Sequence, residues 1–368
     1  MRDRSLFILF FLISFWQFGG GQEKSSRELL KPHFTVPERF KDDFGGYRSP
    51  LEGVDGNWEE KRNAIKREWT DLLGEWPDLF TQPEVKTLES IPDNGITRHK
   101  IQFQWLPGQV TNAWLLIPEG EGTRPAVLTV YYEPETAAGL NDKEYRDFAL
   151  QLARRGFVTL SIGTTESTND KTYSLYYPDI DHSTLQPLSA LACAAANAWY
   201  VLASRAEVDA ERIGIVGHSY GGKWAMFAGC LFDKFAAVAV SDPGIVFDNH
   251  PSVNYWEPWY LGWHPRPWRK RAVISEGNPA RGLYPELIAA GRDLHELHSL
   301  LAPRPFLVSG GAVDPPERWR ALNHLVKINE TLGYENRVGM TNRPDHSPNR
   351  ESNEVIYAFF EHFLKNRP

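Results

Sequence analysis

The residues best suited to covalent chemistry run from Gly217 to Gly221 and read Gly-His-Ser-Tyr-Gly, with Ser219 at the centre. A short, largely apolar run (212–216) precedes them, and small and apolar residues follow (222–229). These flanks predict a buried strand, a sharp turn and a helix, an arrangement that exposes a serine hydroxyl on a strained backbone. Glycine at both ends lets the turn pass close to its neighbours. We therefore predict that Ser219 is a nucleophile.

A serine hydroxyl needs a base to accept its proton, and three histidines follow Ser219 at a suitable distance along the chain. His324 and His362 fall inside predicted helices, where packing or surface roles are more common. His346 lies in a turn (342–348) directly after the last predicted strand. The order of a nucleophile, an acid and then a histidine, each in a loop after a strand, favours His346 as the general base.

The acid that orients the base should follow the strand before the histidine's strand. Asp314 occupies that position in the loop 309–316, although an aspartate before Pro315 also suits a turn or a helix cap. We predict Asp314 as the acid. Glu317 is one reserve, and Asp242, which follows the strand after Ser219, is the other.

Two backbone amides should stabilise the oxyanion that forms when the serine attacks. The residue after the nucleophile, Tyr220, supplies one of them. The second should come from the loop after the predicted strand 126–131. Pro134 has no N–H, which leaves Glu133 or Glu135. We predict Glu133.

The elements that must position these residues alternate between strands and helices. Continuous apolar runs predict buried strands at 126–131, 157–162, 212–216, 235–240, 305–309 and 337–341, whereas alternation near 101–105 predicts an antiparallel edge. Helices are predicted at 57–73, 144–155, 188–202, 285–301, 316–332 and 351–364. This alternation predicts an α/β fold, a mostly parallel sheet with helices on both faces. The loop after the strand that follows Ser219 carries an aromatic-rich insertion.

The whole chain divides into three parts. Residues 1–21 have a charged start and an apolar core too short for a comfortable membrane span, which predicts a secretory signal peptide, with an uncleaved anchor as the alternative. Residues 22–84 form an N-terminal arm and a brace helix, and residues 85–368 a catalytic domain. We expect a secreted or periplasmic protein without stable membrane insertion after cleavage.

The composition limits the possible partners. The 368 residues have a net charge of −7 and no basic run, which argues against nucleic-acid binding. No Cys and His pattern predicts a metal site, and no cofactor is expected. His295 and His298 lie one helical turn apart, but a solvated helix face explains them better than a metal. The two cysteines, Cys193 and Cys230, could form a disulfide or remain buried thiols.

The elbow at Ser219, the Asp314 loop and the His346 loop together resemble the α/β-hydrolase superfamily over residues 85–368. The run from Arg212 through Gly222 is similar to the branch that contains prolyl oligopeptidases, dienelactone hydrolases and acetyl xylan esterases. Lys223, four residues after the serine, resembles the lysine in the Gly-Cys-Ser-Arg-x-Gly-Lys elbow of glucuronoyl esterases. His218 and Tyr220 replace the Cys and Arg of that motif.

The aromatic insertion, residues 255–268, predicts either a wall that stacks on sugar rings or a long loop that packs its own aromatics. The predicted substrate-binding residues are Lys223, Trp256, Trp259 and Trp263. With secretion and the resemblance, this favours a carbohydrate esterase that removes acetyl or methyl groups through an acyl-enzyme on Ser219. The alternatives are a peptidase or acyl-aminoacyl hydrolase, a glucuronoyl esterase and a non-catalytic binding module.

Overall fold

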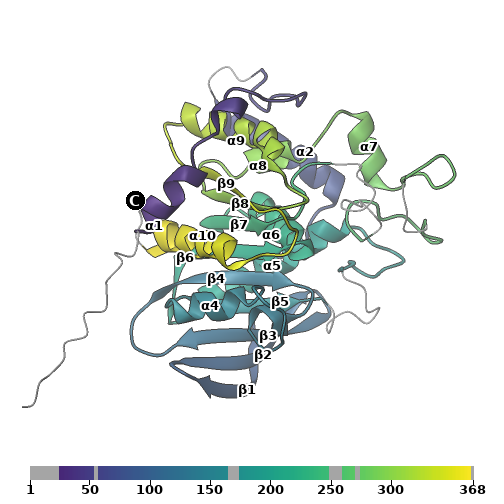
Figure 1. Cartoon of the computed structure of the whole chain (residues 1–368). Helices are drawn as coiled ribbons and strands as arrows, with labels where there is room; N and C mark the ends of the chain where they lie inside the picture. The colour runs from purple at the N-terminus through teal and green to yellow at the C-terminus, as the bar shows by residue number, and fades with distance from the viewer. Residues whose placement is uncertain (1–24, 54–56, 165–173, 248–258, 270–273, 366–368) are drawn as a thin grey trace, which may run out of the picture.

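The computed structural model describes residues 25–53, 57–164, 174–247, 259–269 and 274–365. Within them, a nine-stranded sheet crosses the molecule (Figure 1) in the spatial order β1-β2-β3-β5-β4-β6-β7-β8-β9. The strands are β1 Val85–Asp93, β2 Ile96–Leu106, β3 Gln109–Pro118, β4 Arg124–Tyr131, β5 Val158–Gly163, β6 Val208–His218, β7 Ala237–Ser241, β8 Phe306–Gly310 and β9 Val338–Asn342.

The sheet is antiparallel at one edge and parallel elsewhere. β1, β2 and β3 pair antiparallel, as do β3 and β5, whereas every pair from β5 through β9 is parallel. The predicted fold, a mostly parallel sheet with an antiparallel edge, is confirmed. Because the carboxyl ends of parallel strands share one edge, the loops after β4, β6, β7, β8 and β9 meet there.

Helices cover both faces of the sheet. They are α1 Ser26–Leu30, α2 Trp58–Leu73, α3 Pro134–Ala137, α4 Phe148–Arg154, α5 Pro187–Ala203, α6 Tyr220–Leu231, α7 Leu283–Ala289, α8 His295–Ser299, α9 Trp319–Thr331 and α10 Arg350–Phe360, the last continued by a π-helical turn, Glu361–Lys365. Short 3₁₀ helices span Lys31–His33, Glu38–Phe40 and Pro316–Arg318.

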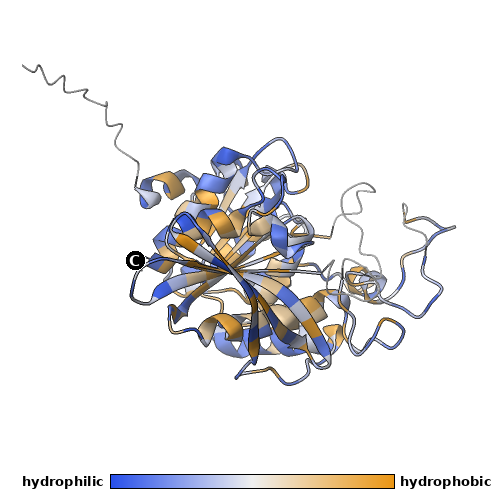
Figure 2. Ribbon diagram, turned by 90° about the horizontal axis from the view of Figure 1, so that it is seen from below, coloured by the Kyte–Doolittle hydropathy of each residue, from blue (hydrophilic) through white to orange (hydrophobic). Residues whose placement is uncertain are grey.

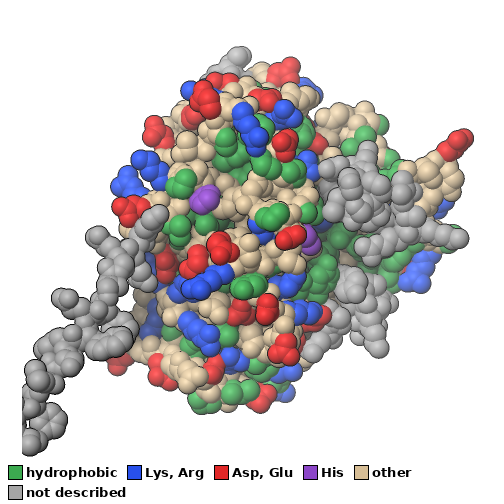
Figure 3. Space-filling view, in the orientation of Figure 1, with side chains coloured by type: hydrophobic (Ala, Val, Ile, Leu, Met, Phe, Trp, Pro, Cys, Tyr) green, Lys and Arg blue, Asp and Glu red, His purple; other side chains and the backbone are tan. Residues whose placement is uncertain are grey.

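The period-two alternation of β4 explains the two layers. Leu128 and Val130 belong to the core that includes α5, α6 and α8, whereas Val127 belongs to the core beneath α4 and α10. Seen from the β1 side (Figure 2), the sheet edge mixes polar and apolar residues, and β1 is exposed along most of its length. Figure 3 shows acidic and basic side chains interspersed over one face of the molecule. None of the described helices is long and apolar enough to cross a membrane.

Two predicted helices differ from the structure, and one short helix in the arm was not predicted. The expected helix 285–301 is two helices, because Gly291 adopts a φ of +67° between α7 and α8. The expected helix 144–155 begins only at Phe148, because Tyr145 has a φ of +60°. The arm contains α1, which Ser25 caps through a capping box with Glu28. The helix predicted at 57–73 is present as α2, with Asn57 as its cap.

Candidate active site

Ser219 sits in a sharp turn between β6 and α6, with a φ of +57° and a ψ of −119°. A Cβ atom on Gly217 would lie 2.1 Å from the Gly221 carbonyl oxygen, and one on Gly221 would lie 2.1 Å from the Val130 oxygen. Both positions therefore require glycine. The turn holds Ser219 in a backbone conformation that L-residues avoid, at the start of a helix, with its side chain partly exposed.

His346 completes a hydrogen-bonded chain with Ser219. Its Nε2 atom lies 2.8 Å from the Ser219 Oγ, and its Nδ1 atom lies 2.7 Å from an oxygen of Asp242. A carboxylate only accepts, so Nδ1–H donates to Asp242 and Nε2 is free to accept the serine O–H. The predicted pairing of Ser219 with His346 is present in the structure.

The prediction that Asp314 orients His346 is wrong in this geometry. Asp242, the reserve, makes that contact, and its carboxylate also accepts the amides of Gly311, Val313 and Asp314 at 2.7–3.2 Å. The Asp314 carboxylate instead accepts the amides of Gly244 and Ile245 at 2.7 and 2.8 Å. The strand order explains the difference: β7 lies next to β6, so its loop is one strand closer to Ser219 than the β8 loop.

The two carboxylates lie fully buried in the interior beside the site. Burial, and then the neighbouring charge of Asp242, raises the pKa of Asp314. The Arg318 Nε atom lies 3.4 Å from the Oδ1 atom of Asp314. Each aspartate is thus fixed by the backbone of the other's loop, and the β7 and β8 ends form one rigid unit.

Arg343 anchors the turn that carries His346. Its guanidinium is buried and donates to the backbone oxygens of Ser309, Gly310, His346 and Ser347, and to the hydroxyls of Ser241 and Ser309. It therefore ties the β9 turn to the ends of β7 and β8. The sequence prediction did not include Arg343; its position three residues before His346 was the available signal.

His218 is the second histidine at the site. Its Nδ1 lies 3.1 Å from both oxygens of Ser241, and its ring packs 4.9 Å from that of His346. Burial, reinforced by the charge of His346, lowers its pKa well below the usual value. His218 is therefore neutral near pH 7, so it supports His346 without competing for a positive charge.

Lys223 lies beneath the site and does not face solvent. It is 4% exposed, its ammonium donates to the Pro243 carbonyl, and it lies 5.6 Å from the centre of the Tyr260 ring. Burial lowers its pKa to about 8. Lys223 thus lies on α6 against the loop that follows β7 and against the Tyr260 ring, and direct contact with a substrate would require Lys223 to leave these partners.

The predicted oxyanion donors lie at the two expected places in the fold. Tyr220 is the first residue of α6. Glu133 follows β4 as the N-cap of α3, and its side chain pairs with Lys143 at 2.7 Å. The end of β4 touches the elbow, since a Cβ on Gly221 would lie 3.1 Å from the Tyr131 Cα. The amides of Tyr220 and Glu133 remain our proposal for the oxyanion donors.

The described part of the aromatic insertion, residues 259–268, contacts the elbow through Tyr260 and a neighbouring loop through its later residues. The ring centres of Tyr260 and Tyr220 are 5.7 Å apart, and those of Trp259 and Tyr260 are 6.2 Å apart. The Trp263 indole donates to the Ile180 carbonyl at 2.9 Å. Trp268 stacks 5.9 Å from Tyr176. The predicted Trp256 falls outside the described residues.

Two further predictions are settled by burial. His295 and His298 are fully buried, so the expected solvated helix face is wrong. Among the described residues, no group of His, Cys, Asp or Glu is arranged to hold a metal ion. Cys193 and Cys230 are both buried free thiols, which decides between the two alternatives, and burial raises the pKa of each to about 12.

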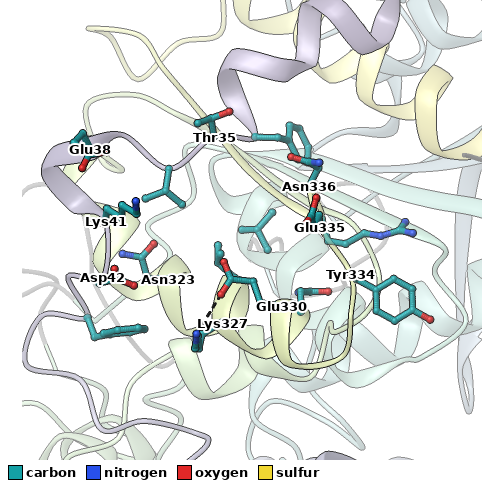
Figure 4. A pocket seen from close by; sticks show the side chains of 17 residues that line it. Thr35, Glu38, Lys41, Asp42, Asn323, Lys327, Glu330, Tyr334, Glu335 and Asn336 are labelled. Atoms are coloured by element: carbon teal, nitrogen blue, oxygen red, sulfur yellow. Dashed lines mark hydrogen bonds and ion pairs between the residues drawn. The ribbon is translucent and has the colours of Figure 1, made fainter.

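A separate hollow of about 480 Å³ lies between the N-terminal arm and the α9–β9 region (Figure 4). Its lining includes Lys41, Asn323, Lys327 and Glu330, and the last two are linked by an ion pair of 3.4 Å. None of the residues around Ser219 lines this hollow. It is therefore distinct from the candidate active site.

One family model matches part of the chain. Residues 194–290 match the model of the prolyl oligopeptidase family, a stretch that contains Ser219 and Asp242 but neither Asp314 nor His346. No curated protein matches the chain by sequence similarity.

Several solved structures are similar to the chain. A glucuronoyl esterase from Solibacter usitatus has a TM-score of 0.65 at 14% identity, with 86% of this chain and 98% of that one covered. A carbohydrate esterase family 15 glucuronoyl esterase from Caldicellulosiruptor kristjansonii has a TM-score of 0.61 at 18% identity, covering 91% and 94%. An acetyl xylan esterase from Paenibacillus sp. R4 has a TM-score of 0.54 at 16% identity, covering 89% and 100%. The chain has the α/β-hydrolase fold that these esterases share.

Proposed function

We propose that this protein is a serine-dependent carboxylic ester hydrolase that acts on ester groups of carbohydrates. The observation that carries the proposal is the hydrogen-bonded chain of Ser219, His346 and Asp242, with links of 2.8 and 2.7 Å. The similarity of the fold to glucuronoyl and acetyl xylan esterases supports the carbohydrate ester as the substrate class.

The geometry suits acyl transfer in two stages. The Ser219 Oγ attacks the ester carbonyl while His346 Nε2 accepts its proton, and Asp242 stabilises the imidazolium through Nδ1–H. The amides of Tyr220 and Glu133 would bind the oxyanion. His346 then protonates the leaving alcohol, and an acyl group stays on Ser219. Water, deprotonated by His346, releases the carboxylic acid and regenerates the serine.

Replacing Ser219 by alanine tests the proposal. Ser219→Ala should lower kcat on p-nitrophenyl acetate and on acetylated xylan by a factor on the order of 10⁶, the loss seen when a triad serine is removed. Mass spectrometry of the wild type with a phosphonate ester should show one adduct, on the peptide that contains Ser219. Ser204→Ala, at the end of α5, is a matched control that should keep full activity. More than a few per cent of residual activity in Ser219→Ala would refute the assignment.

A peptidase or acyl-aminoacyl hydrolase is the second candidate, because residues 194–290 match the prolyl oligopeptidase model. Aminoacyl p-nitroanilides and p-nitrophenyl acetate distinguish the two: we expect the ester to be hydrolysed and the anilides to be poor substrates. Methyl glucuronate esters, tested in parallel, decide between a deacetylase and a glucuronoyl esterase.

We also propose that the protein acts outside the cytoplasm after removal of residues 1–21. The proposal rests on the charged start and the apolar run of this segment, which lies outside the described residues. The first described helix begins at Ser26, so cleavage near Gln22 would leave the capping box of α1 intact. Sequencing the N-terminus of the exported protein tests this.

A further inference from the structure

The loop between α3 and α4 carries an arginine to the edge of the candidate site. The Arg146 Nη2 donates to the Ser347 hydroxyl at 3.0 Å, and Ser347 directly follows His346. Burial raises the pKa of Tyr131, at the end of β4, and the charge of the nearby Arg146 opposes that rise. Tyr131 stacks 6.2 Å from His218, the residue before Ser219. Arg146 therefore contacts the residue next to His346 directly and reaches the residue before Ser219 through Tyr131.

The backbone is strained where it delivers this side chain. Tyr145 has a φ of +60°, a conformation that a bulky L-residue rarely adopts. The Asn353 side chain, which is 3% exposed on α10, donates to the Tyr145 carbonyl at 2.8 Å and holds the loop there. This strain delays the start of the helix that the sequence predicts over 144–155 to Phe148. A fixed, strained residue next to a reactive site is a pattern that functional positions often show.

Arg146 also keeps its positive charge available. Among the described residues, no carboxylate forms an ion pair with it, and its other hydrogen bonds go to the Glu144 carbonyl at 3.3 Å and to the Tyr131 side chain. Its neighbour Lys143 is already paired with Glu133. Arg146 is partly exposed. A guanidinium has five N–H donors in a planar fork that matches a carboxylate, so Arg146 has donors left for a ligand.

We propose that Arg146 recognises a carboxylate on the substrate, so that the enzyme prefers esters of oligosaccharides that carry a free uronate close to the reacting ester. The proposal rests on the proposed function and names its substrate class. Arg146 is a specificity residue here: it binds the acidic sugar and fixes the ester relative to Ser219, whereas the bond-making steps belong to Ser219 and His346.

Two synthetic acetylated xylo-oligosaccharides that differ in one branch sugar, glucuronate or glucose, test the preference. The wild type should have a kcat/KM about 10- to 100-fold higher for the acidic compound, the range expected for a hydrogen-bonded charge pair. Arg146→Gln should remove this difference, mostly by raising KM for the acidic compound. High salt should reduce the preference of the wild type.

Two control variants separate recognition from a structural role. Arg154→Gln removes an exposed charge at the far end of α4, at the opposite edge of the sheet, and should keep the preference. Ser347→Ala removes the hydroxyl partner but leaves the guanidinium, and should keep it too. Equal losses on both oligosaccharides in Arg146→Gln and Ser347→Ala would show that Arg146 only anchors the His346 turn, and would overturn the proposal.

The same assays distinguish a failure of the Arg146 proposal from a failure of the proposed function. A wild type that hydrolyses p-nitrophenyl acetate but shows no preference between the oligosaccharides, or cleaves neither, would overturn the role of Arg146 and leave the esterase assignment standing. A wild type that hydrolyses no ester would refute the proposed function. In that case, calorimetry would measure the binding of the two oligosaccharides to the protein. If Arg146 recognises a carboxylate, the acidic oligosaccharide should bind more tightly than the neutral one.

Discussion

Asp242 and Asp314 accept hydrogen bonds from the backbone of each other's loops, but only Asp242 also reaches His346. The two side chains therefore share burial and surroundings; Asp314 lies 3.4 Å from the Arg318 guanidinium, and only Asp242 contacts His346. The two aspartates can therefore be compared by making the same substitution at each position. The substitution removes a buried charge in both cases, but only at Asp242 does it change the hydrogen bond that orients His346.

Asp242→Asn should lower kcat by about 10⁴-fold. An amide nitrogen in place of the contacting oxygen would donate to Nδ1, and His346 would then hold its proton on Nε2, where it cannot accept from Ser219. Asp314→Asn should lower thermal stability but keep kcat within about tenfold, because His346 retains Asp242. The measurements are steady-state kinetics on p-nitrophenyl acetate and thermal unfolding of both variants. A severe loss in Asp314→Asn beside a mild one in Asp242→Asn would reverse the assignment.

The sequence identified Ser219 and His346 because each stands in a distinctive local setting, a glycine-flanked turn after a strand and a turn after the last strand. The carboxylate that contacts His346 could not be identified from such a local setting. Both Asp242 and Asp314 follow buried strands and precede proline, and the choice depends on which carboxylate rotates toward a histidine that lies 104 residues beyond Asp242. The burial of Lys223 was not predictable for a similar reason, since it depends on contacts with Tyr260 and Pro243.

At the scale of elements, the described part of the aromatic insertion contains two tryptophans with contrasting contacts. Trp259 lies against Tyr260, which covers Tyr220 and Lys223 next to the elbow. Trp263 has both of its N–H groups directed at another loop: its amide donates to the Gln186 side chain and its indole to the Ile180 carbonyl. The position of Trp259 fits a substrate wall, whereas the contacts of Trp263 fit a structural brace.

Alanine at each tryptophan should therefore give different results. Trp263→Ala should lower the free energy of unfolding by about 3 kcal/mol, from lost packing and hydrogen bonds, with similar losses of kcat/KM on a small ester and on an acetylated oligosaccharide. Trp259→Ala should reduce kcat/KM for the oligosaccharide at least tenfold more than for p-nitrophenyl acetate. Denaturant unfolding and the two assays measure this. Identical profiles for the two variants would contradict the division.

The elements that the sequence predicted well are those whose signal is local. The buried strands β4 to β9 read as apolar runs, and α2 has a capping asparagine and a terminal glycine. The errors arose where a single backbone angle decides the outcome. Gly291 divides one expected helix into α7 and α8, and Tyr145 delays α4, held by an asparagine more than 200 residues away. Such a contact leaves no periodic pattern in the sequence.

On the scale of the whole molecule, the N-terminal arm is held on α8 and α9 by buried histidines. The His295 Nε2 lies 2.6 Å from the Arg48 carbonyl, and the His324 Nε2 lies 3.3 Å from the Phe44 carbonyl. The rings of His295 and His324 are 4.9 Å apart. His298 lies deeper and contacts the Met226 sulfur at 3.3 Å. These side chains connect the arm to the helix layer behind Ser219.

Burial lowers the pKa of His295 to about 4 and that of His298 to about 3, and it also lowers the pKa of His324. An unfolded histidine binds a proton near pH 6.5, so the unfolded chain takes up more protons than the folded one below that value. The contribution of these histidines to the free energy of unfolding is therefore fully present above about pH 6.5, and it is lost as the pH falls toward 4. Burial raises the pKa of Asp293 to about 6, and this opposes part of the loss between pH 6 and 4.

The free energy of unfolding should thus fall by about 1–3 kcal/mol between pH 7.5 and pH 5, the balance of about 2 kcal/mol from each of His295 and His298 against the contribution of Asp293. Urea unfolding at the two pH values measures it. His298→Gln cannot take up a proton, so it should shrink the difference between the two pH values even though it lowers stability at both. His182→Gln, at an exposed histidine, should leave the difference as in the wild type. If His298→Gln keeps the full difference, the acid sensitivity of the fold resides in other groups, and the histidines only pack the arm.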